Sequence, residues 1–459
     1  MVIISESARS LKGCWAVSGL RGVAAAMVLR MVLAFIGHRG RMTCSAAAGS
    51  VASESIHRGQ LTRFLARPRW QKIDFNAPLR RALLDHEARR AEGKPGRYIF
   101  IIDATLVSQA GPKTQNTHST GNRVRRPCQG RRYNKKKVVR KTCHSFTFGL
   151  LITPSGVRIP FQIPYYTKEY CQQKNIPHRT TAESAADLIR GLPLPEGADV
   201  VVLGDTAYDA EVVQRACRER GYLWIVPANP ERVYEGPPGH RPKVRTRLKD
   251  WTSLSLTTIR LHMSTGKYAD YRRLSRWRVG PKQKPRVFYV HQERANVRRV
   301  GDVQLVFSTT KQKLSKATPD EVKILMTNAT RMSPREVVEL YSLRWQIELF
   351  FKELKSTLGF AQYRFQKFEA VRAWAEIALT TVLFLEQQRA QRLADRRQSE
   401  EKRKWWKAQR LHGLCAAYRQ ECAGRELKYL SDRLKTPGGI EKLKRHLQAA
   451  LPKEYRSAN

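Results

Sequence analysis

The sequence predicts an α/β protein with helical regions at both ends and a mostly β segment inserted into its core. Three short apolar runs read as buried strands, at Tyr98–Asp103, Asp199–Gly204 and Tyr222–Val226, and amphipathic helical patterns lie between the last two. Residues 228–325 form a separate block that is rich in Pro and Gly at first and then strand-like. The two ends of the chain have helical patterns, so the strands belong to a central region.

Composition indicates a folded protein with an anionic partner. The chain has 459 residues, of which 41 % are hydrophobic, and this is enough for a packed core. Lys and Arg number 85 against 39 Asp and Glu, which gives a net charge of +46 at pH 7. Such a charge favours a polyanion, most often nucleic acid, and an anionic membrane surface is the alternative. The length suggests two to four domains.

The cysteines and the apolar runs indicate a cytoplasmic protein without a membrane partner. The eight cysteines are scattered and form no C-x-x-C pair, so free thiols are expected. His412, Cys415 and Cys422 lie close in sequence but lack a fourth zinc ligand. Arg30 interrupts the N-terminal apolar stretch before it reaches the roughly 18–20 residues that a bilayer requires.

Residues 1–90 read as a helical N-terminal region that binds DNA. Residues 1–20 show little periodicity and are expected to lack regular structure. Residues 22–67 predict three short helices, of which two begin after the N-cap residues Thr43 and Ser55. This order is compatible with a helix-turn-helix unit, although any small helical bundle has the same pattern.

Residues 91–227 read as the first part of the core and contain a basic arm. Residues 107–142 hold eleven Lys and Arg and no acidic residue, which predicts a long loop that binds phosphates; a solvated, mobile loop is the alternative. The candidate DNA contacts in this arm are Arg125, Arg126, Arg131, Arg132, Lys135, Lys136 and Lys137. The alternating runs on either side of Pro154–Gly156 predict a hairpin.

The remaining elements follow from caps and periodicity. Thr181–Arg190 predicts a helix, and Asp209 is expected to cap another that ends at Gly221. After the insertion, Lys323–Thr327 predicts a strand that returns to the core. Ser333 then reads as the N-cap of a long helix. We expect residues 326–385 to complete the core and residues 386–459 to form a basic helical C-terminal region.

Two aspartates are candidates for metal binding. Asp103 and Asp205 each follow an apolar strand, and ligands collect at strand ends on one edge of an α/β sheet. Two carboxylates at such an edge repel each other unless a cation holds them. Mg²⁺ suits this role because it prefers carboxylate oxygens. The alternative for each residue is an ordinary turn at the end of a strand.

A third acidic residue lies on the long helix. At 100° per residue, one narrow polar stripe contains Tyr341, Arg344, Glu348, Lys352 and Lys355. A separate apolar stripe of the same helix faces the core. Taken alone, the stripe is better explained by ordinary i,i+4 ion pairs along the helix.

The spacing of this stripe resembles a known signature. Tyr341, Arg344, Glu348 and Lys355 match the Y-(2)-R-(3)-E-(6)-K pattern of bacterial insertion-sequence transposases of the insertion-sequence-4 type. The resemblance covers roughly residues 95–375 and includes the blocks around Asp103 and Asp205. It implies a ribonuclease-H-like core, interrupted by a β insertion, in which Asp103, Asp205 and Glu348 form a D-D-E triad.

The resemblance further implies a metal-dependent DNA transposase that acts as a homodimer on transposon ends. Two Mg²⁺, for which Mn²⁺ can substitute, would be held by the triad and drive in-line phosphoryl transfer. Tyr341, Arg344, Lys352 and Lys355 would contact DNA phosphates. Trp251 or Trp277 could stack on a base, although packing within the insertion is the simpler interpretation. A non-catalytic transposase derivative that regulates through DNA binding is the alternative function.

Overall fold

The computed structural model describes most of the chain. The described residues are 4–38, 40–49, 56–67, 70–90, 96–109, 111, 113–125, 136–229, 231–233, 243–244, 255–262, 267–273, 285–311, 321–436 and 438–441. Trp251 and Trp277 lie outside these ranges, so the expectation that one of them stacks on a base stays a prediction.

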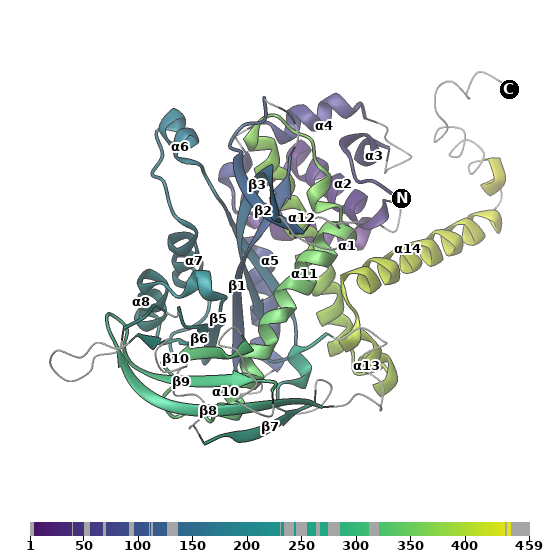
Figure 1. The fold of residues 1–459 in the computed structure, drawn as a ribbon. Helices are drawn as coiled ribbons and strands as arrows, with labels where there is room; N and C mark the ends of the chain where they lie inside the picture. Colours follow the sequence, from purple (N-terminus) through teal and green to yellow (C-terminus); the bar gives the residue numbers. More distant parts are fainter. Residues whose placement is uncertain are drawn as a thin grey trace, which may run out of the picture.

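A ten-stranded mixed sheet runs through the protein (Figure 1). Its strands are β1 (Tyr98–Ser108), β2 (His118–Arg125), β3 (Lys136–Ile152), β4 (Arg158–Pro164), β5 (Val200–Leu203), β6 (Leu223–Pro227), β7 (Thr257–Leu261), β8 (Arg286–Val297), β9 (Gly301–Thr309) and β10 (Lys323–Thr327). The order is β2-β3-β1-β5-β6-β10-β9-β8-β7, and β4 pairs with β3. Only β1, β5 and β6 are parallel to one another among these pairings. The mixed α/β class predicted from the sequence is confirmed.

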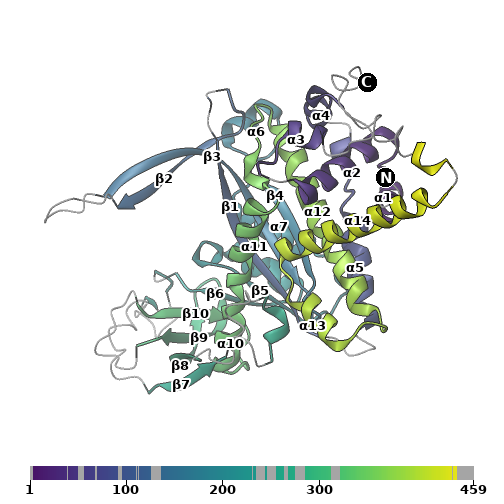
Figure 2. The ribbon, with the colours of Figure 1, turned by 90° about the vertical axis from the view of Figure 1, so that its right-hand side faces the viewer.

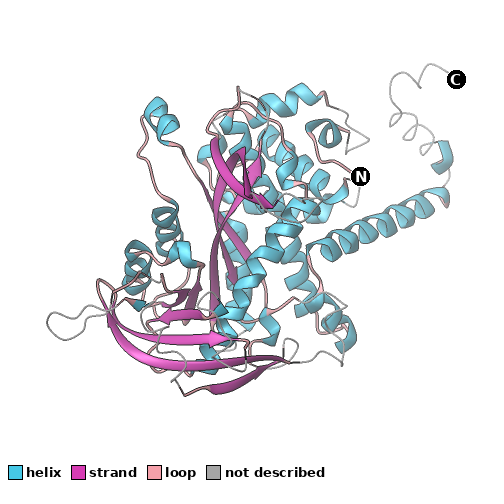
Figure 3. Ribbon diagram, in the orientation of Figure 1, coloured by secondary structure: helices cyan, strands magenta, loops and turns pink. Residues whose placement is uncertain are grey.

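Helices cover both faces of the sheet (Figure 3). They are α1 (Ile4–Val17), α2 (Gly22–Gly37), α3 (Cys44–Ala48), α4 (Arg58–Leu65), α5 (Ala77–Arg90), α6 (Lys168–Lys174), α7 (Thr181–Arg190), α8 (Glu211–Glu219), α10 (Pro334–Tyr341), α11 (Trp345–Ser356), α12 (Phe368–Ala394), α13 (Glu400–Ala408) and α14 (Leu411–Leu434). Helices α7 and α8 lie on one side, and α11 and α12 on the other (Figure 1). No helix within the described ranges is long and apolar enough to cross a membrane.

The inserted strands continue the core sheet. β10 pairs with β6 on one side and with β9 on the other, and β8 and β7 follow outward. The predicted return strand at Lys323–Thr327 is therefore confirmed, and it joins the insertion to the core by backbone hydrogen bonds.

The N-terminal region is more ordered than the sequence suggested. The expectation that residues 1–20 lack regular structure is wrong, because Ile4–Val17 form α1 and bury Leu11 and Trp15. Thr43 caps α3 as predicted, and its hydroxyl accepts the Ala46 N–H at 3.1 Å. His57 caps α4 in place of Ser55, which lies outside the described residues.

The basic arm is a β-hairpin and not a loop. β2 pairs with the first half of β3 in an antiparallel register that runs from His118↔Cys143 to Arg125↔Lys136. This hairpin projects from the body of the protein (Figure 2). The strands of this hairpin are joined by backbone hydrogen bonds, and their sequence lacks the alternation of apolar and polar residues that predicts a strand. The hairpin was therefore not predicted from the sequence. Arg125, Lys136 and Lys137 lie on its strands, whereas Arg126, Arg131, Arg132 and Lys135 fall outside the described residues.

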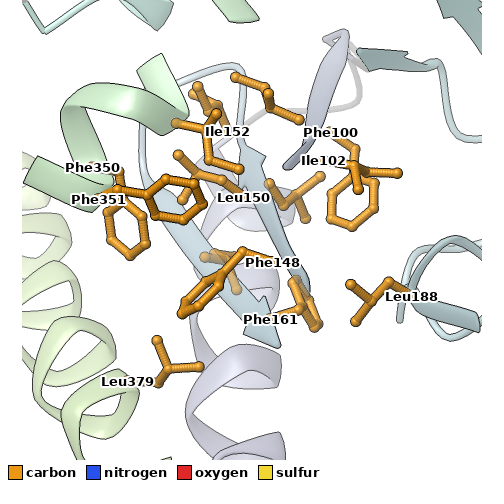
Figure 4. Close-up of a cluster of buried hydrophobic side chains, with 14 of the residues drawn as sticks. Phe100, Ile102, Phe148, Leu150, Ile152, Phe161, Leu188, Phe350, Phe351 and Leu379 are labelled. Carbon is orange, nitrogen blue, oxygen red and sulfur yellow. The ribbon is translucent and has the colours of Figure 1, made fainter. Parts of the chain in front are cut away.

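Aromatic packing fixes the signature helix on the sheet. The ring of Phe148 on β3 lies 5.3 Å from that of Phe351 and 6.2 Å from that of Phe350, centroid to centroid (Figure 4). Gly149 allows the Phe100 ring to approach β3, since a Cβ there would lie 2.1 Å from that ring. The apolar stripe of α11 thus faces the core, as the sequence predicted, and the structure shows that it packs against β3.

Candidate active site

Pairing between two parallel strands brings Asp103 and Asp205 to the same level of the sheet. The register of β1 and β5 runs to Ile101↔Leu203, and the two aspartates follow at the same spacing. Asp103 does not end its strand as predicted. β1 continues to Ser108 because β3 pairs with it throughout, so Asp103 lies in mid-strand where β5 ends.

Asp205 follows β5 and caps a single turn of 3₁₀ helix at Thr206–Tyr208. Its carboxylate accepts the Ala207 N–H at 2.9 Å. Asp209 does not cap α8 as predicted, because its carboxylate pairs with Arg232, whose Nη2 lies 2.8 Å from Oδ1. Asp205 and Asp209 therefore have different partners, the first at the 3₁₀ turn and the second at Arg232.

The signature helix is broken just before Glu348. α10 ends at Tyr341, residues Ser342–Arg344 form a 3₁₀ turn, and α11 begins at Trp345. The prediction of one continuous helix is therefore wrong. The predicted start is confirmed, because the Ser333 hydroxyl accepts the Glu336 N–H at 3.2 Å.

Arg344 joins two of the three acids. Its Nη1 lies 3.4 Å from Oδ2 of Asp103 on β1, and its Nη2 donates to Oε1 of Glu348. The i,i+4 ion pair of a solvated helix is present, but the same guanidinium also reaches a residue 241 positions away in sequence. That second contact distinguishes the cluster from ordinary pairing on a helix surface.

The carboxyl of Asp103 is buried near the other two acids. Its pKa is raised to about 6, chiefly by burial and also by the negative charges of Asp205 and Glu348, while the Ala104 N–H and the Arg344 guanidinium act to lower it. The three acids therefore repel one another, and the single positive charge of Arg344 offsets only part of their negative charge.

Two tyrosines line the cluster. Burial and the charges of Asp103 and Asp205 raise the pKa of Tyr208, and its buried hydroxyl has no hydrogen-bond partner among the described residues. Burial raises the pKa of Tyr341 to about 12. Tyr341 is only 9 % exposed, so most of its side chain is buried beside the cluster.

The two lysines of the predicted polar stripe have different surroundings. The ammonium of Lys355 donates to the Leu106 carbonyl on β1 at 2.9 Å, so it ties α11 to the sheet. Lys352 is exposed. Trp345, which sequence reasoning did not select, is 50 % exposed beside Arg344.

Sequence reasoning also missed Lys323 at the start of β10. Its ammonium lies 5.0 Å from the centroid of the Tyr341 ring. It also interacts electrostatically with Arg344, Glu348 and Asp205. A return strand antiparallel to β6 places its first residue at the edge where Asp205 lies, and this was the available signal.

A buried charge network anchors the opposite face of α11. The amide oxygen of Gln346 accepts from Arg158 Nη2 at 2.7 Å and from the Arg273 N–H at 3.2 Å. Glu353 pairs with Arg410, whose Nε lies 2.8 Å from Oε1. These contacts orient the helix that carries Glu348, and sequence patterns read their charges as surface residues.

The residue types of the acid cluster suit a divalent cation, but their arrangement in the described residues does not gather three of them around one point. Asp103, Asp205 and Glu348 supply the carboxylate oxygens that Mg²⁺ prefers, and they exceed the positive charge of Arg344. Within the described ranges, no three His, Cys, Asp or Glu side chains are grouped closely enough to hold a metal ion. Arg344 takes the bridging place between Asp103 and Glu348 instead.

Fold and site together define an α/β protein with a carboxylate cluster at the end of a central parallel strand. Residues 171–385 match the family model described as "Transposase DDE domain". This domain implies a ribonuclease-H-like core and a catalytic transposase that acts on DNA. The matched range contains Asp205 and Glu348 and begins after Asp103. No curated protein matches the chain.

Proposed function

We propose that the protein is a DNA transposase of the insertion-sequence-4 type. It binds the terminal inverted repeats of an insertion sequence, hydrolyses the phosphodiesters at the transposon ends and joins the 3′-hydroxyl ends to target DNA. One observation carries the proposal: Arg344 lies between Asp103 and Glu348, and the charge of Asp205 reaches Asp103. These residues come from segments far apart in the chain.

Each residue of the cluster has a task in this reaction. Asp103, Asp205 and Glu348 are the residues that would hold two Mg²⁺, or Mn²⁺ in their place. Such ions, when bound, activate the attacking oxygen and stabilise the leaving oxygen of an in-line displacement at phosphorus. The fork of Arg344 binds a DNA phosphate through two N–H donors. Tyr341 keeps its proton at neutral pH and can donate a hydrogen bond.

The division of labour along the chain is part of the proposal. Residues 91–227 and 326–385 form the catalytic core, and residues 228–325 are its insertion. Residues 1–90 and the basic hairpin contact DNA outside the cut, while residues 386–459 form a C-terminal region. Two copies synapse a pair of ends, which places the reaction in a homodimer on double-stranded DNA.

The first prediction concerns metal removal. On a duplex that carries the inverted repeat flanking the gene, we expect cleavage at the repeat end with Mg²⁺ and none with EDTA. Mn²⁺ restores cleavage because it accepts the same oxygen ligands. Denaturing electrophoresis of end-labelled strands measures the products, and a duplex with a scrambled repeat is the control. Cleavage that persists in EDTA contradicts the proposed chemistry.

The second prediction concerns the bridging cation. Arg344→Gln removes the guanidinium that pairs with Asp103 and Glu348, so we expect a melting temperature lower by about 2 °C without metal. Mg²⁺ should then raise the melting temperature of the variant more than that of the wild type. Arg190→Gln, which breaks an exposed ion pair with Glu219, is the matched control. Equal shifts with Mg²⁺ in Arg344→Gln and the wild type place the ion elsewhere.

A further inference from the structure

The first residue of β10 lies at the edge of the sheet that carries the acid cluster. β6 runs parallel to β5, and β10 is antiparallel to β6 with Leu325 opposite Pro227. Lys323 therefore lies beyond the end of β6, on the edge where Asp205 follows β5. Its backbone is fixed there by pairing with Ser308 on β9.

The ammonium of Lys323 points into the field of the cluster. It lies over the Tyr341 ring, 5.0 Å from the centroid, and such a contact favours a positive charge. Glu348 and Asp205 attract it, whereas Arg344 repels it. The ammonium thus lies within electrostatic reach of two acids of the candidate site and of Arg344.

The donors of this ammonium are unused. Among the described residues, Lys323 has no side-chain hydrogen bond or ion pair, and the residue is exposed. In contrast, Arg344 is engaged by Asp103 and Glu348, and Lys355 by the Leu106 carbonyl. A cation that is oriented by an aromatic ring and has three available N–H donors is suited to a phosphate oxygen.

We propose that Lys323 binds a DNA phosphate at the carboxylate cluster, a role that rests on the proposed transposase function. The return strand of the insertion delivers this lysine, so the insertion contributes a side chain to the site as well as extending the sheet. The ligand is the phosphate backbone of DNA, and a phosphate contact does not depend on the base sequence. Lys323 therefore helps to position the DNA but does not recognise its sequence.

Lys323→Met tests this role because it keeps the aliphatic stem over the Tyr341 ring and removes the charge. Loss of one phosphate contact should reduce the slope of log affinity against log salt concentration by about 0.9. Cleavage of the inverted-repeat duplex should fall roughly tenfold to a hundredfold. Lys323→Arg should recover most of both. The melting temperature should stay near that of the wild type, which a purely structural role would not predict.

Lys168→Met is the matched control, because Lys168 is an exposed lysine at the start of α6, which lies away from β10 in both views (Figures 1 and 2). If Lys323→Met and Lys168→Met have the same salt slope and cleavage rate, the proposal is wrong. If the wild type binds the duplex but does not cut it, the transposase function fails. The salt slope then still decides whether Lys323 contacts a phosphate, and Lys323→Gln repeats the measurement with a polar side chain.

Discussion

Glu348→Gln should abolish cleavage of the inverted-repeat duplex while leaving DNA binding largely intact. The substitution keeps the size of the side chain and its capacity to accept from Arg344, but it removes one of three negative charges that would hold the metal. When several residues act as a unit in catalysis, replacing one of them removes most of the activity. We therefore expect the rate of cleavage to fall roughly a thousandfold or more. Binding depends on the net charge of +46, which the substitution raises by one.

The comparison needs a variant with the same chemical change elsewhere. Glu211→Gln serves this purpose, because Glu211 is exposed in the first turn of α8. Rate constants for strand cleavage and dissociation constants from gel shifts are measured for both. Full cleavage by Glu348→Gln would falsify the triad. If the wild type binds without cutting, the alternative of a non-catalytic regulator is correct.

The sequence predicted the site through spacing and the strands through apolar runs. Glu348 was found because helical geometry groups it with Arg344, and β5 and β10 were found because nearly all of their residues are buried. Helix α7 also agrees with its predicted bounds, since its cap, Thr180, lies directly before it. Such local signals depend only on neighbours in the chain.

The errors come from partners far away in sequence. β1 extends past Asp103 because Phe148 pairs opposite it, and no pattern around Asp103 could show this. The helix breaks at Ser342–Arg344, where Arg272 donates to the Glu339 carbonyl and to the Ser342 hydroxyl from outside the helix. A backbone carbonyl that a guanidinium binds is less available to the helix, so tertiary contact overrides periodicity.

The buried charge network is the clearest case that composition could not foresee. Charged side chains of this kind usually lie at the surface. Four of them are at most 2 % exposed here, namely Arg158, Arg273, Glu386 and Arg389. The carboxylate of Glu386 on α12 accepts from Arg273 at 2.6 and 2.8 Å and from Arg389 at 3.0 Å. Arg273 and Arg389 also donate to the Gly156 carbonyl in the turn between β3 and β4. The network therefore joins the insertion, which contains Arg273, to this turn and to α12.

Glu386→Gln should therefore destabilise the protein strongly. The variant leaves the buried guanidinium groups of Arg273 and Arg389 without their carboxylate partner, and breaking a buried pair in this way costs about 3–5 kcal/mol. Chemical denaturation at pH 7 measures the change in the free energy of unfolding. Glu400→Gln, which removes an exposed i,i+4 pair with Lys404, should have no measurable effect. An unchanged unfolding midpoint in Glu386→Gln contradicts the role of this carboxylate.

The pH dependence gives an independent check on the same residue. Burial raises the pKa of Glu386, but the charges of Arg273 and Arg389 lower it to about 2, against 4.5 for an ordinary glutamate. The folded state thus binds fewer protons than the unfolded state, so the contribution of Glu386 is complete above pH 4.5 and is lost as the pH falls toward 2. The difference in unfolding free energy between the wild type and Glu386→Gln should be constant from pH 7 to pH 5 and shrink below that. A difference that grows on acidification would mean that Glu386 is protonated in the folded state, and the arginines would then need another anion.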